Sequence, residues 1–127
     1  RLNHIGTHPV YTDLAIDNAL DYQEMIGTDR KENRLRYIQR YWSDRLRKIK
    51  NVVINTPIEE HKSCGIANVG IKSMDPGKLA KILLDKYQIF TVAINHENVV
   101  GCRISPNVYT NEEDLEHFIS SIKELAI

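Results

Sequence analysis

The spacing of hydrophobic residues predicts two helices at the start of the chain. The first runs from Thr12 or Asp13 to about residue 26, and its apolar face consists of Ala15, Ala19, Tyr22 and Ile26. The second runs from about residue 28 to residue 48, and its apolar face consists of Leu35, Ile38, Trp42, Leu46 and Ile49. Both faces repeat at helical intervals of three and four, so we expect both helices to pack on a common core.

Further along, short alternating runs predict four strands, at residues 51–55, 64–71, 88–94 and 99–104. A helix opens at Asp75 and Pro76, and a last helix follows Thr110, which has capping-box spacing with Glu113. The last helix should bury Leu115, Phe118, Ile119, Ile122 and Ala126. The order α-α-β-β-α-β-β-α predicts a two-layer α/β (α+β) sandwich, with helices covering a mainly antiparallel sheet of three or four strands.

One strand carries a candidate binding residue. Val100, Cys102 and Ile104 fall on one face of residues 99–104, and Arg103 falls on the other, beside Gly101. A guanidinium next to a residue without a side chain suits a carboxylate or phosphate, because its planar fork donates two parallel hydrogen bonds. The alternative is a surface arginine paired with a nearby acid, and spacing alone favours that simpler interpretation.

Length, composition and charge narrow the function classes. A chain of 127 residues with 27% charged residues is typical of one globular domain, and no apolar run approaches the roughly 18 residues of a membrane span. Residues 29–50 hold nine basic and three acidic residues, a net of +6, with Tyr37, Tyr41 and Trp42 among them. This pattern is compatible with nucleic-acid binding, but we interpret it as a solvated helix face because Trp42 lies on the apolar stripe.

The cysteines and histidines do not indicate a metal site. Cys64 and Cys102 lack metal-ligand spacing, and free thiols suit a reducing, cytoplasmic location. No pair of histidines has ligand spacing, so we expect no metal. The chain starts at Arg1 without a methionine, so we expect a fragment, and an upstream targeting segment stays possible.

Three short groups of residues near the C-terminus resemble the C-terminal signature of class V aminotransferases, which are pyridoxal-phosphate (PLP) enzymes of fold type I. They are residues 103–105 (Arg-Ile-Ser), 109–111 (Tyr-Thr-Asn) and 112–114 (Glu-Glu-Asp). A second match is the Ile-Gly-Thr-His-Pro segment at residues 5–9. The resemblance covers nearly all of the chain, and the isopenicillin N epimerase-like branch looks closest.

The resemblance implies a single C-terminal small domain over residues 1–127, with a helical connection at 1–50 and an α/β sandwich at 51–127. It implies that Arg103 binds the carboxylate of an amino acid or related amine. It also implies that Gly6 and Thr7 contact the PLP phosphate, with His8 lining the site, in a homodimer. The lysine that forms a Schiff base with PLP lies upstream in this family, so we expect no catalytic residue in the chain and no activity from it alone.

Two alternatives stay open. A cysteine desulfurase needs a cysteine on the loop before the arginine strand, and residues 95–98 contain none. This leaves transaminase, epimerase or lyase chemistry. The epimerase-like branch is preferred, with cysteine desulfurase or lyase chemistry as the runner-up. The other alternative is a stand-alone α/β binding or interaction module without catalysis.

Overall fold

The computed structural model describes Gly6 and residues 10–127, which fall into two compact units. The first unit covers residues 1–31 and the second covers residues 32–127, and each is described by itself. Most of the second helix belongs to the same unit as the sheet, and the boundary expected at residue 50 stays a prediction.

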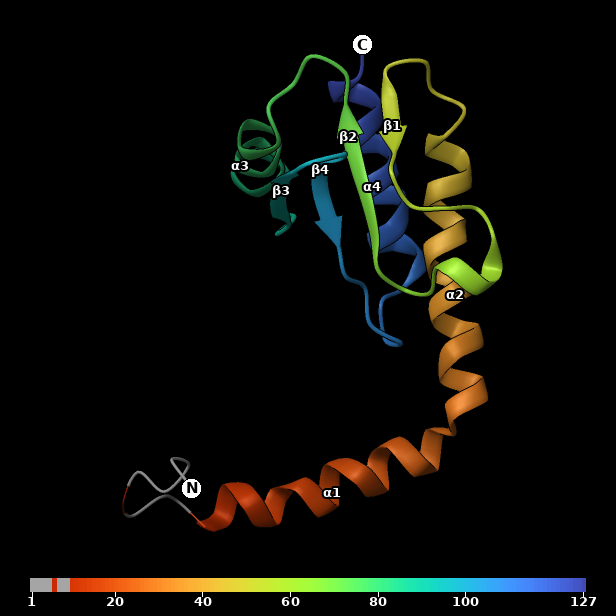
Figure 1. The fold of residues 1–127 in the computed structure, drawn as a ribbon, viewed down its shortest axis with the longest axis vertical. Coiled ribbons are helices and arrows are strands. Elements are labelled where there is room, and N and C mark those ends of the chain that lie inside the picture. Colours follow the sequence, from red (N-terminus) through yellow and green to blue (C-terminus); the bar gives the residue numbers. More distant parts are fainter. Residues whose placement is uncertain (1–5, 7–9) are drawn as a thin grey trace. The chain divides into compact units, whose positions relative to one another are not determined.

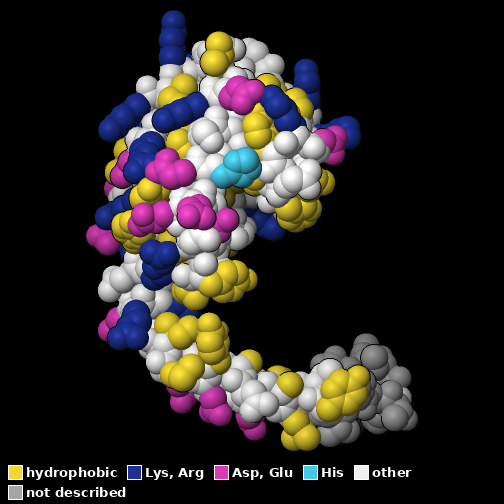
Figure 2. All heavy atoms as spheres, turned by 180° about the vertical axis from the view of Figure 1, so that it is seen from behind, with side chains coloured by type: hydrophobic (Ala, Val, Ile, Leu, Met, Phe, Trp, Pro, Cys, Tyr) yellow, Lys and Arg dark blue, Asp and Glu magenta, His cyan; other side chains and the backbone are white. Residues whose placement is uncertain are grey.

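The first unit contains helix α1 (Val10–Ile26), which ends at Gly27. Gly27 has a φ of 85°, a left-handed conformation that favours glycine after a helix. The apolar stripe expected to be buried is not: Ala15, Ala19 and Tyr22 are exposed, and Ile26 is half-buried. Figure 2 shows hydrophobic side chains along this helix, with acidic ones on one side.

The second unit contains most of α2 (Thr28–Leu46) and the remaining elements. In chain order these are β1 (Val52–Ile54), the short 3₁₀ helix η1 (Glu60–Lys62), β2 (Ala67–Ile71), α3 (Pro76–Tyr87), β3 (Val92–His96), β4 (Val99–Ile104) and α4 (Glu112–Leu125). This order confirms the predicted one.

The four strands form one antiparallel sheet in the order β1-β2-β4-β3. Figure 1 shows α2 and α4 behind β1 and β2, with α3 beside β3. Because the helices gather on one face of the sheet, the predicted two-layer α/β architecture is confirmed.

The core lies between these helices and the sheet. On α2, Ile38, Trp42 and Leu46 have no exposed surface, as their spacing predicts. The Trp42 and Phe118 rings meet edge to face, with centroids 5.3 Å apart, which joins α2 to α4. All five residues expected to be buried on α4 are buried.

The outer surfaces of α2 and α4 are joined by polar contacts. The hydroxyl of Tyr37 donates to Glu112 at 2.6 Å, and that of Tyr41 donates to Glu116 at 2.5 Å. Arg45 also pairs with Glu116, and both bonds hold the pKa of that carboxyl below its usual value. Basic and acidic side chains therefore intermix on this surface (Figure 2), which favours a solvated helix face over a nucleic-acid interface.

Two predicted strands begin later than expected. β2 begins at Ala67 rather than Cys64, because η1 and the residues after it are bound to α2 as described below. β3 begins at Val92 rather than Gln88. Gln88 instead ends α3 in a left-handed conformation, with φ 59° and ψ 30°, and its N–H donates to the carbonyl of Leu84.

Two details near β4 also differ from the prediction. The capping box of α4 is Asn111 with Asp114, because the Thr110 hydroxyl instead accepts from the N–H of Asn107 at 3.0 Å. Val100 is 44% exposed, so the apolar face of β4 does not extend to it.

In the part of the chain that the structure describes, no helix is long and apolar enough to cross a membrane. The same residues contain no cluster of three histidine, cysteine or acidic side chains that could bind a metal ion.

We predict that Leu83→Ala lowers the free energy of unfolding by about 2–5 kcal/mol, because Leu83 is fully buried and truncation leaves a cavity. Its neighbour Leu84 is 44% exposed on the same helix, so Leu84→Ala should change stability by less than about 1 kcal/mol. Urea unfolding followed by circular dichroism measures both. Equal losses in the two variants would contradict the assigned core.

Candidate functional site

Arg103 lies on β4 with its side chain exposed. Its neighbour Cys102 points the other way: Cys102 has no exposed surface, and its Sγ lies 3.5 Å from the carbonyl oxygen of Pro76. Successive side chains of a strand point to opposite faces, so Arg103 projects away from the helices of the core. It makes no hydrogen bond or ion pair with any residue that the structure describes.

Arg103 belongs to a row of residues that crosses the sheet. Its register partners are Asn68 on β2 and Val92 on β3, and partners directly opposite share a face. Just after β1, the N–H of Asn55 donates to the carbonyl of Asn68 at 3.1 Å, which extends the row. The two asparagines and the arginine therefore form a polar row on the sheet face opposite Cys102.

The two asparagine side chains are paired. Asn55 Nδ2 donates to Asn68 Oδ1 at 2.6 Å and to the carbonyl of Val100 at 3.0 Å. The Asn68 N–H donates to Thr56 Oγ1 at 2.9 Å. Asn68 is 8% exposed, and its Nδ2 has no partner among the described residues.

Gly101 lacks a side chain for a reason that the sequence does not reveal. A Cβ at this position would lie 2.5 Å from the carbonyl oxygen of Val69 and 2.6 Å from Asn68 Oδ1. The space expected to admit a ligand is therefore filled by the Asn68 carboxamide. Gly70 on β2 is similar, since its Cβ would lie 2.7 Å from the carbonyl oxygen of Val100. These glycines allow β2 and β4 to approach closely beside Arg103.

A hollow of about 430 Å³ lies next to the asparagine pair. Asn55, Gly70 and Val100 line it, together with Lys72 and Asn95. Arg103 does not line this hollow, and its guanidinium is exposed instead.

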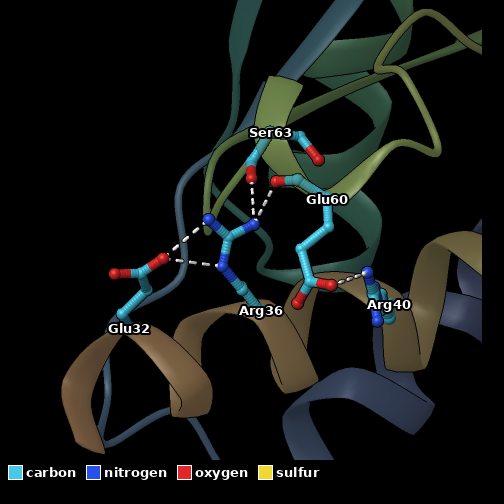
Figure 3. Close-up of polar contacts among 5 residues, drawn as sticks. All are labelled: Glu32, Arg36, Arg40, Glu60 and Ser63. Carbon is cyan, nitrogen blue, oxygen red and sulfur yellow. Dashed lines mark hydrogen bonds and ion pairs between the residues drawn. The ribbon is translucent and has the colours of Figure 1, made fainter. Parts of the chain in front are cut away.

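Arg36 of α2 and Arg47, directly after α2, hold the connection between β1 and β2, which bears Asn55 and leads to Asn68. Arg36 donates to the backbone carbonyls of Glu60 and Ser63, and to Glu32 Oε1 at 2.7 and 2.9 Å (Figure 3). The bond to Glu32 raises the pKa of Arg36, so the clamp stays charged. Arg47 donates to the carbonyls at positions 54 and 56. The connection is therefore fixed both to α2 and to the residue that directly follows it.

The segment after Arg103 is fixed in the same way. Arg34 donates through Nη2 to the carbonyl of Thr110 at 2.9 Å and through Nε to that of Val108 at 3.3 Å. The N–H of Thr110 donates to the carbonyl of Asn107 at 2.9 Å. Arg34 and Arg36 of α2, and Arg47 directly after it, thus stabilise loops, whereas Arg103 has no such partner among the described residues.

The N-terminal site residues can be compared only in part. Gly6 is described and exposed, while Thr7 and His8 lie outside the described residues. Their predicted contacts with a cofactor phosphate stay predictions.

The lysines of this chain do not suit covalent PLP binding. All nine are exposed except Lys31, which is half-buried and donates to Gln23 at 2.6 Å. A lysine that forms a Schiff base needs a lowered pKa, which burial would supply. Acidic partners instead raise the pKa of Lys81 and Lys86.

Cys102 also lacks the properties of a nucleophile. Burial raises the pKa of its thiol, which disfavours the reactive thiolate. The turn between β3 and β4 consists of Glu97 and Asn98 and contains no cysteine. Cys102 is therefore a core residue, as its position in the strand predicts.

Arg103 is the binding residue that the sequence predicts, and that role stays a prediction; the sequence did not single out Asn55, Asn68 or the three arginines that hold the loops. One signal was present: Asn68 is the only polar side chain within the otherwise apolar strand Ala67–Ile71. The contacts of Arg36 and Arg47 join α2 and the residue after it to a later loop, and no local sequence pattern marks them.

Comparison with known families now identifies the class. Residues 2–118 match the aminotransferase class-V family, and the chain belongs to it. Enzymes of this family use pyridoxal phosphate. No curated protein matches the chain significantly.

Two solved structures share the fold. An apo cysteine desulfurase from Thermococcus onnurineus NA1 has a TM-score of 0.73 and 24% identity, over 84% of this chain and 28% of its own. An alanine–glyoxylate aminotransferase from Nostoc sp. has a TM-score of 0.71 and 18% identity, over 96% of this chain and 33% of its own. The chain thus spans about a third of the length of these structures.

We predict that Arg36→Ala loosens the connection between β1 and β2. Hydrogen exchange at residues 59–64 should speed up by about 10-fold or more, and the free energy of unfolding should fall by about 1.5–3 kcal/mol, because several charge-assisted hydrogen bonds are lost. The matched control is Arg40→Ala, which loses only an exposed ion pair with Glu60 at 3.7 Å (Figure 3). Faster exchange in the control but not in Arg36→Ala would refute the clamp.

Proposed function

We propose that this chain is the small domain of a PLP-dependent class V aminotransferase-like enzyme that acts on an amino acid or related amine. Within it, Arg103 binds the carboxylate of the substrate. The observation that carries this proposal is an exposed guanidinium with no partner among the described residues, on the sheet face turned away from the core, in a member of this family.

The physical case for Arg103 rests on contrast with its neighbours. Arg34, Arg36 and Arg47 each donate to backbone carbonyls, so their charges are used within the fold. Arg103 keeps all five donors for a ligand. A carboxylate can accept two parallel hydrogen bonds from such a fork, and charge-assisted bonds contribute about 1.5–3 kcal/mol each.

The rest of the active site would come from outside this chain. The lysines here are too exposed to be the Schiff-base residue, and the solved relatives are about three times longer. PLP would supply the electron sink for the reaction once the large domain binds it. Gly6, Thr7 and His8 would approach the cofactor phosphate, in a homodimer that forms part of this proposal.

Within the family, transaminase or epimerase chemistry of the isopenicillin N epimerase-like branch fits this chain better than desulfurase chemistry. Sulfur removal needs a reactive thiolate, but Cys102 is buried and its pKa is raised. The turn before β4 supplies no other thiol.

In the intact PLP-loaded protein, Arg103→Ala should weaken amino-acid binding by about 10- to 100-fold or more, because the fork to the carboxylate is lost. Arg103→Lys keeps the charge but not the fork, so it should be impaired too. Titration of each variant with substrate, followed by the absorbance of PLP, gives the affinity. Arg40→Ala is the control and should bind like the parent. Parental affinity in Arg103→Ala would remove the basis of the proposal.

The chain alone should form no covalent PLP complex at one site. Treatment of residues 1–127 with PLP and borohydride, followed by peptide mass spectrometry, should show at most scattered, substoichiometric labelling of exposed lysines. A stoichiometric adduct on a single lysine would show instead that this chain contains its own Schiff-base site.

A further inference from the structure

The register partner of Arg103 carries a buried hydrogen-bond donor that no described residue accepts. It is Nδ2 of Asn68, which the described residues leave without a partner although Asn68 is 8% exposed. Buried polar groups in folded proteins are nearly always hydrogen-bonded. An unpaired donor next to an unpaired guanidinium therefore needs an explanation.

The remaining polar groups of Asn68 are all satisfied. Its N–H donates to Thr56 Oγ1, its carbonyl accepts from the N–H of Asn55, and its Oδ1 accepts from Asn55 Nδ2 at 2.6 Å. Asn55 Nδ2 also donates to the carbonyl of Val100, so the orientation of the Asn55 amide is fixed. This in turn places the oxygen of Asn68 toward Asn55 and leaves its nitrogen free.

The position of this donor matches that of Arg103. Asn68 and Arg103 are register partners on adjacent strands, so their side chains leave the same face of the sheet. The Cβ atoms of such partners lie about 4.5–5.5 Å apart, a gap that one carboxylate can bridge. The last torsion of asparagine is soft, so a modest rotation can present Nδ2 while Oδ1 stays near Asn55.

We propose that Asn68 is a second substrate-contacting residue: its Nδ2–H donates to the same carboxylate that Arg103 binds. This inference rests on the proposed function and adds a specificity element to it. Arg103 supplies charge and a planar fork, while Asn68 supplies a neutral donor held by the Asn55 pair. Together they favour a substrate with a carboxylate over the corresponding amine without one.

The test compares two ligands on the intact PLP-loaded protein: an amino-acid substrate and the amine that lacks only its carboxylate. Asn68→Ala removes the donor, so affinity for the amino acid should fall by about 5- to 20-fold while affinity for the amine stays the same. Asn68→Asp replaces the donor by a charged acceptor and should lower amino-acid affinity further. The matched control is Asn51→Ala, which loses a bond to the carbonyl of Ala126 at the other end of β1. It should bind both ligands like the parent.

If Asn68 had only a structural role, its substitution would disturb the sheet and lower the affinity for both ligands. The ¹⁵N resonance of the Asn68 side-chain amide provides a readout that needs no variant: it should shift when the amino acid binds and stay in place with the amine. The inference is overturned if Arg103→Ala weakens amino-acid binding but Asn68→Ala and Asn68→Asp do not. It is also overturned if the Asn68 variants lose affinity equally for the amino acid and the amine. If Arg103→Ala itself has no effect, the proposed function fails, whatever the Asn68 variants do.

A double variant tests whether the two residues share one carboxylate. Groups that bind the same ligand atoms are energetically coupled. Adding Asn68→Ala to Arg103→Ala should therefore lower the affinity for the amino acid by less than 2-fold. Fully additive losses would overturn the shared contact and assign Asn68 to another part of the ligand.

Discussion

The close antiparallel pairing of β2 with β4 is the constraint on which the site depends. It places Cys102 opposite Val69 in the core and Arg103 opposite Asn68 on the other face. The pairing needs glycine at positions 70 and 101, where a Cβ would approach backbone oxygens within 2.7 Å. A shift of one residue would exchange the two faces, burying the guanidinium and exposing the thiol. The same register therefore sets both the core and the proposed binding surface.

The loops next to this strand pair are held in place by hydrogen bonds from arginine side chains rather than by regular secondary structure. Arg36 and Arg47 fix the long connection between β1 and β2, and Arg34 fixes the turn after β4. Arg34 and Arg36 come from α2, which also supplies Trp42 to the core, and Arg47 directly follows this helix. One helix thus both fills the core and holds the two loops that flank the polar row. Three of the nine basic residues in 29–50 are thus used within the fold.

The sequence alone predicts the order of elements and the core of α2 and α4, because helical periodicity reports burial directly. The sequence is a weaker guide where contacts with other parts of the chain decide the local structure. β3 begins late because Gln88 takes a left-handed helix cap, and the α4 cap moves to Asn111 because Thr110 is used in the preceding turn. Arg103 could be found from alternation and family resemblance. Asn68 could not be paired with it, since their proximity follows from a register that joins residues 35 positions apart.

The central claim is that the carboxylate of a substrate binds on the Arg103 face of the sheet. The most direct measurement is a crystal structure of the intact protein with a reduced, unreactive conjugate of PLP and an amino acid. The account predicts both terminal nitrogens of Arg103 at about 2.7–2.9 Å from the two carboxylate oxygens. A carboxylate held by other residues, with Arg103 still directed into solvent, would contradict it.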